Sequence, residues 1–155
     1  MPPVFLYAPE DFHNLCLLAR TLEALGHREC CLFDPHRLVR ERYGKVRARE
    51  ARAVSAGALE KMRWVSIAEP DRLLADHPGR VVATVVERGA TSLVEHRFEK
   101  SDLVVFGPES RGLPPGVIAR SAVSLTIPLL GETQSLNLAV ALGIVLFERL
   151  RQIGC

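Results

Sequence analysis

No apolar stretch of this 155-residue sequence approaches the roughly 18 residues that a membrane-spanning helix requires. The first residues also lack the basic start and the apolar segment of a secretory signal. We therefore predict a cytoplasmic protein that does not bind membranes.

Cysteine is scarce, and none of the four cysteines forms a Cys-x-x-Cys pair or has histidines at zinc-ligand spacing. This pattern predicts reduced structural thiols and no metal site. The glycine-rich phosphate loop and the Gly-x-Gly-x-x-Gly dinucleotide motif are also missing. Their absence disfavours a nucleotide-dependent enzyme of flavodoxin-like architecture.

The chain has little net charge, +2 at neutral pH, but the charge is unevenly distributed. Between His36 and Arg52, seven Lys and Arg residues face two Glu residues, so this basic segment carries +5 and the remainder −3. A local basic patch can bind phosphate even when the whole chain is nearly neutral. The segment also fits an ordinary solvated face. Its candidate RNA contacts are Arg37, Arg40, Arg42 and Lys45.

The length predicts a single domain over residues 1–155. Apolar, β-branched runs predict strands at residues 4–7, 29–33, 63–67, 80–86, 101–106 and 124–127. Helical spacing and capping residues predict helices at residues 11–26, 48–58, 70–75, 114–120 and 135–152. This alternation predicts an α/β fold with a mostly parallel sheet flanked by helices.

The last predicted helix is apolar on nearly every side over residues 136–147. Such a helix must be covered all round. In a domain of this size, one face can pack on the sheet and the other on a second subunit, which favours a symmetric homodimer. The alternative is a central core helix within a monomer.

Two predicted strands end in polar loops, at residues 107–112 and 131–137. Loops at the carboxyl ends of parallel strands commonly line ligand crevices. Gly107 permits close backbone approach to a ligand, and Glu109 and Arg111 can orient the loop and a substrate such as RNA. Taken alone, the first loop also fits a tight structural turn.

Residues 106–113 (FGPESRGL) and 135–138 (SLNL) resemble, in order, the second and third motifs of the SPOUT RNA methyltransferases, SpoU/TrmH branch. The resemblance implies methyl transfer from S-adenosyl-L-methionine to a ribose 2′-hydroxyl of structured RNA. It also implies a homodimer whose last helix threads through a loop as a trefoil knot.

The single-domain length resembles that of minimal tRNA enzymes, one subgroup of which modifies the anticodon wobble position. Residues 49–58 instead resemble relatives that act elsewhere in the anticodon loop. Transfer RNA is therefore the expected substrate, with the nucleotide left open.

The resemblance also implies which residues form the site. Backbone groups at Thr84, Gly107, Ile127 and Leu136 would hold the cofactor, with Glu109 and Ser135 beside it. The third motif supplies Ser135 and Asn137, which join Glu109 as candidate catalytic residues. Physically, Ser135 and the free N–H groups of the last helix offer donors to an anion.

The first motif is kept only in part. Asn14 and Arg20 match its outer positions and are the remaining candidate catalytic residues that the resemblance implies, whereas Cys16 and Leu17 replace its Gly and inner Asn. Arg20 lies almost opposite the apolar stripe of its predicted helix at about 100° per residue, so it can reach a partner subunit or an RNA phosphate. Because a guanidinium stays protonated, phosphate binding and charge stabilisation suit Arg20 better than general-base catalysis.

A second hypothesis is a non-catalytic RNA-binding or assembly protein that retains the fold. The altered first motif and the basic segment motivate it. Binding of the cofactor distinguishes the two hypotheses, since an RNA binder has no need of that pocket.

Overall fold

A seven-stranded parallel sheet forms the centre of the protein in a computed structural model, which describes residues 3–39, 45–87 and 89–154. The sheet order is β3-β2-β1-β6-β4-β7-β5. The strands are β1 (Val4–Tyr7), β2 (Glu29–Phe33), β3 (Arg63–Ser66), β4 (Val81–Thr84), β5 (Thr91–Ser92), β6 (Leu103–Phe106) and β7 (Val123–Thr126). The predicted parallel α/β fold is confirmed.

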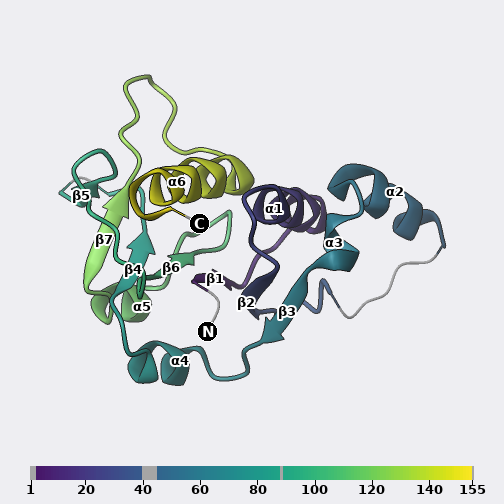
Figure 1. Ribbon diagram of the computed structural model, residues 1–155, viewed down its shortest axis with the longest axis horizontal. Coiled ribbons are helices and arrows are strands. Elements are labelled where there is room, and N and C mark those ends of the chain that lie inside the picture. The colour runs from purple at the N-terminus through teal and green to yellow at the C-terminus, as the bar shows by residue number, and fades with distance from the viewer. Residues whose placement is uncertain (1–2, 40–44, 88, 155) are drawn as a thin grey trace.

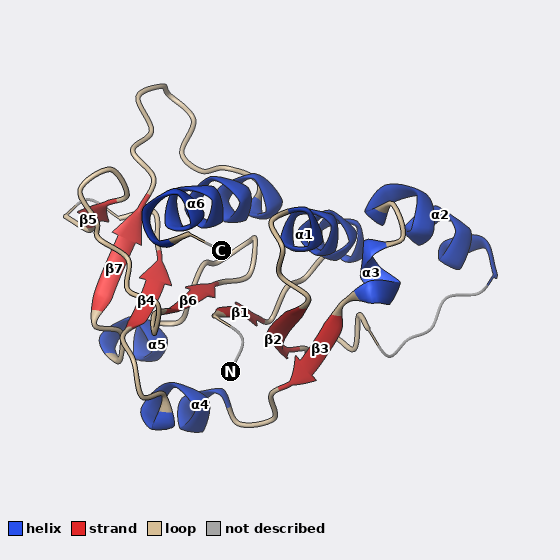
Figure 2. Ribbon diagram, in the orientation of Figure 1, coloured by secondary structure: helices blue, strands red, loops and turns tan. Residues whose placement is uncertain are grey.

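Helices cover both faces of this sheet (Figures 1 and 2). They are α1 (Phe12–Ala24), α2 (Lys45–Ser55), α3 (Ala58–Lys61), α4 (Pro70–Asp76), α5 (Pro115–Ala119) and α6 (Leu138–Ile153). Helices α1 and α6 lie side by side over one face, and α4 and α5 lie over the other.

Each face of the sheet has its own hydrophobic core because side chains alternate along a strand. In β1, Val4 and Leu6 pack beneath α1 and α6, whereas Phe5 packs with Leu74 of α4 and Val117 of α5. The central strands are thus apolar on both faces, as expected for a parallel sheet between two helical layers.

Helix α1 follows from local signals in the sequence. The Asp11 side chain accepts a hydrogen bond from the Asn14 backbone N–H at 2.7 Å, and Gly26 follows the helix with a φ of 84°. Its apolar stripe, Leu15, Leu18 and Leu22, is fully buried. Arg20 is exposed on the other side, as predicted.

Two predicted helices have different boundaries in the structure. Helix α6 begins at Leu138 rather than residue 135, because Asn137 is its N-cap and accepts hydrogen bonds from the Ala139 and Val140 N–H groups. The helix predicted at residues 48–58 begins at Lys45 and breaks at Ala56 and Gly57, which both have positive φ. Strand β5 was missed because two residues carry no periodic signal.

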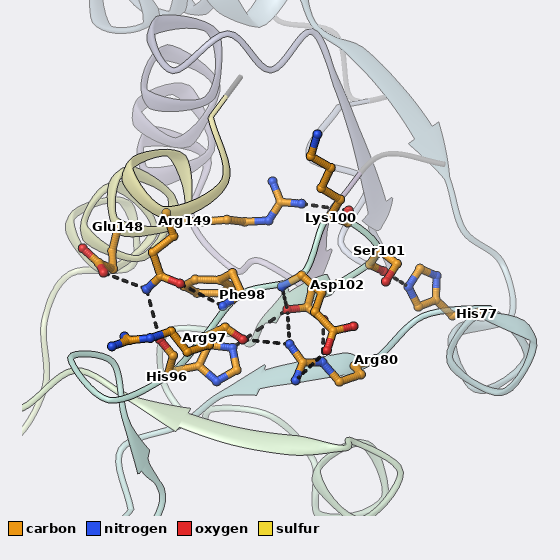
Figure 3. A network of polar contacts seen from close by, with 12 residues as sticks. His77, Arg80, His96, Arg97, Phe98, Lys100, Ser101, Asp102, Glu148 and Arg149 are labelled. Carbon is orange, nitrogen blue, oxygen red and sulfur yellow. Dashed lines mark hydrogen bonds and ion pairs between the residues drawn. The ribbon is translucent and has the colours of Figure 1, made fainter.

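The far end of α6 is held against the segment between β5 and β6. Gln152 accepts a hydrogen bond from the Phe98 N–H at 2.9 Å and donates to the His96 carbonyl at 3.0 Å. Arg149 donates to the Lys100 carbonyl at 3.1 Å (Figure 3). These contacts lie at the opposite end of the strands from the loops of the predicted site.

Helix α6 is not covered all round within one chain. Its inner face is buried through Leu142, Val145 and Leu146, whereas Val140 and Phe147 are 51% and 61% exposed. No helix of the described residues is long and apolar enough to cross a membrane. The trefoil knot stays a prediction from the family resemblance.

Candidate functional site

A cleft of about 1080 Å³ opens at the carboxyl ends of β4, β6 and β7, beside the start of α6. This volume suits a site for a cofactor-sized ligand. The walls are formed mainly by residues 84–87, 106–113, 125–129 and 133–138, together with Asn14. Both polar loops singled out from the sequence therefore line the same cleft.

Two glycines allow the loop after β6 to turn sharply. A Cβ at position 107 would lie 2.5 Å from the Leu113 backbone nitrogen, so only glycine fits there. Gly112 has a φ of 66°, and its N–H donates to the Pro108 carbonyl at 3.0 Å. Buried Leu113 anchors the end of the loop. The tight turn holds the intervening polar residues at the cleft wall.

Three residues from the three predicted motifs form one hydrogen-bonded chain. Asn14 of α1 donates its side-chain amide to Glu109 at 3.0 Å. Asn137 donates its own amide to the Asn14 side-chain oxygen at 2.9 Å, while its oxygen caps α6. All three residues line the cleft. The fold thus joins the start of α1, the loop after β6 and the start of α6 at one point.

Glu10, which sequence reasoning did not single out, adds a second link to this arrangement. Its backbone N–H donates to Glu109 at 2.9 Å. Its carboxylate accepts hydrogen bonds from the Ser110 N–H at 3.0 Å and hydroxyl at 2.9 Å, and lies 3.7 Å from the Arg111 guanidinium. The Ser110 hydroxyl, foremost, lowers the pKa of Glu10 below its ordinary value. One signal in the sequence indicates that Glu10 belongs to the site, namely its position just after the strand β1.

The predicted cofactor-binding residues come together in the cleft. Thr84, Gly107, Ile127, Ser135 and Leu136 all line it. Thr84 also donates its hydroxyl to the Val105 carbonyl at 2.9 Å, which fixes the end of β4. The wall carries both apolar side chains and exposed polar groups, and position 107 leaves the backbone open. This combination fits S-adenosyl-L-methionine, which has an apolar ring face and a charged amino-acid part.

Arg20 does not line the cleft. Its exposed guanidinium donates to the Val54 carbonyl of α2 at 3.5 Å. Within one chain, the structure therefore separates Arg20 from the other candidate catalytic residues.

The two altered positions of the first motif lie away from the cleft wall. Cys16 is 1% exposed in the core, and Leu17 is half-buried against it. Burial raises the pKa of the Cys16 thiol to about 11, so it is not a reactive thiolate. Both replacements thus extend the packed face of α1.

The predicted RNA contacts are only partly described. Arg37 is exposed after β2, and Arg111 is 82% exposed at the cleft. Lys45 is the first residue of α2. Arg40 and Arg42 lie outside the described residues.

Comparison with known proteins identifies the family. The model of the SpoU rRNA Methylase family matches residues 2–147. The chain is 32% identical over 146 residues to the 23S rRNA (guanosine-2′-O-)-methyltransferase RlmB of Acinetobacter baylyi. That match covers 92% of this chain but 56% of the relative, so this chain spans little more than half of that enzyme's length.

Solved structures share the whole fold. One, described as giving structural insights into the 2-OH methylation of C/U34 on tRNA, has a TM-score of 0.80 and 36% identity, covering 97% of this chain and 94% of that chain. A second, an AdoMet-bound rRNA methyltransferase from Sinorhizobium meliloti, has a TM-score of 0.79 and 25% identity. It covers 99% of this chain and 59% of that chain. The chain belongs to the SpoU rRNA Methylase family of RNA ribose 2′-O-methyltransferases.

Proposed function

We propose that this chain transfers the methyl group of S-adenosyl-L-methionine to a ribose 2′-hydroxyl of transfer RNA. The observation that carries this proposal is the set of hydrogen bonds that joins Glu109 and Asn137 through Asn14. These bonds bring three distant motif residues together at one large cleft. The cofactor would be held by backbone groups at Gly107, Ile127 and Leu136.

When bound, the cofactor supplies an electrophilic methyl group, so the protein's main task is to hold the ribose oxygen in line at about 3 to 3.5 Å. Glu109 is fixed by two donors and Asn137 by the helix that it caps, so these groups are preorganised for that positioning. The Ser135 hydroxyl lies exposed on the same wall and can bind an anionic or hydroxyl group.

Arg20 would act on the substrate from outside the cleft of its own chain. An exposed guanidinium binds a phosphate through paired hydrogen bonds and stabilises developing negative charge. We place Arg20 opposite the cleft of a second copy or against the RNA backbone. Turnover should fall when Arg20 is replaced by Lys, because Lys cannot make paired contacts. Full turnover of that variant would exclude this role.

The substrate proposal rests on the similarity of the chain to a solved structure concerned with tRNA. The structure concerned with C/U34 of tRNA matches at nearly full length on both sides, which favours a wobble nucleotide. Arg37 and Arg111 are exposed. Together with the basic segment of the sequence, they would contact RNA phosphates. The location that fits this substrate is the cytoplasm.

The functional form would be a homodimer. Val140, Ile144 and Phe147 recur at i, i+4 and i+7 on α6, and all three side chains are exposed. A second copy is the simplest cover for such a stripe, since a symmetric contact buries the same patch twice.

The alternative, an RNA-binding protein without activity, has less support. It was motivated by the altered first motif and the basic segment. Cys16 is buried in the core and Leu17 is half-buried against it, so both changes in the motif leave the cleft wall intact. The cleft keeps every predicted cofactor position.

Calorimetric titration with S-adenosylhomocysteine tests the proposal first. Saturable binding at about one site per chain is expected. Transfer of labelled methyl groups to unfractionated tRNA is measured next. Mapping the position of the methylated ribose then identifies the nucleotide. A folded protein that binds RNA, but neither binds S-adenosylhomocysteine nor transfers methyl groups, would establish the alternative.

A further inference from the structure

We infer that Ser110 and Arg111 form a phosphate-binding subsite for the RNA backbone, and that the Glu10 carboxylate occupies this subsite when RNA is absent. Glu10 is thus an internal competitor of the substrate. The inference rests on the proposed RNA-modifying function and adds to it a specific contact and a means of controlling affinity.

The donors around Glu10 are those that recognise a phosphate. A backbone N–H and a hydroxyl from Ser110 reach separate carboxylate oxygens at 3.0 and 2.9 Å. The Arg111 guanidinium lies 3.7 Å away from the same group. Backbone amides, hydroxyls and Arg are common phosphate contacts of proteins that bind nucleic acids. A carboxylate and a phosphate both present anionic oxygens, so either can satisfy these three donors.

The subsite lies where the sheet topology favours a ligand. Strands β1 and β6 are neighbours, with Leu6 paired to Phe106, although about a hundred residues separate them in the chain. The chain runs outward from this pair in both directions, through β2 and β3 on one side and β4 and β7 on the other. Loops that leave such a switch point form a crevice for ligands. Glu10 leaves β1 and Ser110 leaves β6 on either side of that crevice.

Displacing Glu10 would cost little. Its side chain is 26% exposed and that of Arg111 is 82% exposed, so both can return to water. An ion pair whose partners reach water contributes little to stability, far less than is lost when a buried charge is left unpaired. Ser110 and Arg111 both line the cleft, so a phosphate in their grasp would lie beside the ribose to be methylated.

The test compares Glu10→Gln with Glu29→Gln in RNA binding. Both substitutions remove one negative charge from a carboxylate that is hydrogen-bonded in the free protein, but Glu29 pairs with Arg63 at the amino-terminal ends of β2 and β3. Filter binding of unfractionated tRNA at low salt measures affinity. We expect Glu10→Gln to lower Kd about fivefold and Glu29→Gln less than about twofold.

Arg111→Ala supplies the second arm of the test. It should raise Kd, reduce the slope of log affinity against log salt by about 0.7 to 0.9, and cancel the gain of Glu10→Gln in the double variant. If Glu10→Gln unfolds the protein, the salt slope of Arg111→Ala alone tests the phosphate subsite. A slope equal to that of the wild type then overturns the inference.

Three other outcomes overturn it. Weaker RNA binding by Glu10→Gln would make Glu10 a residue that positions the loop. Equal effects of the two Gln variants would reflect overall charge. Tighter binding of S-adenosylhomocysteine with unchanged RNA binding would assign the anion to the cofactor's carboxylate. Loss of methyl transfer with the expected RNA results would reject the proposed reaction and keep the subsite.

Discussion

Asn137 performs two tasks with one side chain. Its oxygen accepts hydrogen bonds from the first N–H groups of α6, and its nitrogen donates to Asn14. The helix start and the motif chain are thereby coupled at a single residue.

Asn137→Ala and Asn137→Asp separate these tasks. Ala removes the cap and should lower the free energy of unfolding by about 1 kcal/mol, measured by urea denaturation. Asp keeps the cap but cannot donate to Asn14, so stability should be retained while methyl transfer falls about tenfold or more. Equal activity of Asn137→Asp and the wild type would show that the hydrogen bond from Asn137 to Asn14 has no role in the mechanism.

Gly107 is required by backbone packing. In Gly107→Ala, the new Cβ would collide with the Leu113 backbone, so we expect a loss of about 1 to 3 kcal/mol in stability and weaker binding of S-adenosylhomocysteine. Gly131→Ala is the matched control, since a Cβ there meets no atom of the described part of the chain within 4 Å. A Gly107→Ala protein as stable as this control would contradict the steric argument.

Among the elements, the segment between β5 and β6 is held to the rest of the molecule by buried polar groups (Figure 3). Asp102, with a fully buried side chain, accepts two hydrogen bonds from Arg80 at 2.9 Å. His96 is 5% exposed, and its buried Nε2 atom has no hydrogen-bond partner among the described residues and lies 3.9 Å from Asp102.

Burial of histidines predicts a loss of stability in mild acid. Burial is the main cause that lowers the pKa of His96 below 6.5, with Asp102 opposing the shift, and burial likewise lowers the pKa of His27. The unfolded chain therefore binds more protons, so stability is fully present above about pH 6.5 and falls as the pH drops toward the folded pKa values. The slope is at most about 1.4 kcal/mol per pH unit for each histidine.

Urea denaturation between pH 8 and pH 5 measures this dependence. His96→Gln, which does not titrate, should reduce the slope while His27 maintains the remainder. A stability that rises on acidification through this range would show that the histidines gain charge partners on folding.

At the scale of the whole molecule, the exposed stripe on α6 predicts association. Phe147→Asp places a charge in this stripe and should convert a dimer to a monomer in analytical ultracentrifugation. Ala119→Asp, on the exposed end of α5 over the opposite face of the sheet, should leave the mass unchanged. A wild-type monomer, or a Phe147→Asp dimer, would contradict the proposed homodimer.

Much of the fold could be predicted because its signals are local. Val4–Tyr7 and Glu29–Phe33 are strands with the predicted bounds, and α1 begins after Asp11 as its cap requires. The start of α6 could not be placed, since both Ser135 and Asn137 are suitable caps and only the contact with Asn14 distinguishes them.

The sequence by itself determined the alternation of elements, the two glycine-marked loops and the motif residues, because periodicity, capping and turn chemistry act over a few residues. Only the tertiary structure decided that β1 lies beside β6, that Asn14 meets Glu109 and Asn137, and that Glu10 faces Ser110. It also placed Arg20 outside the cleft. These relations join residues about a hundred positions apart, and strand order, which packing of the whole sheet selects, brings them together.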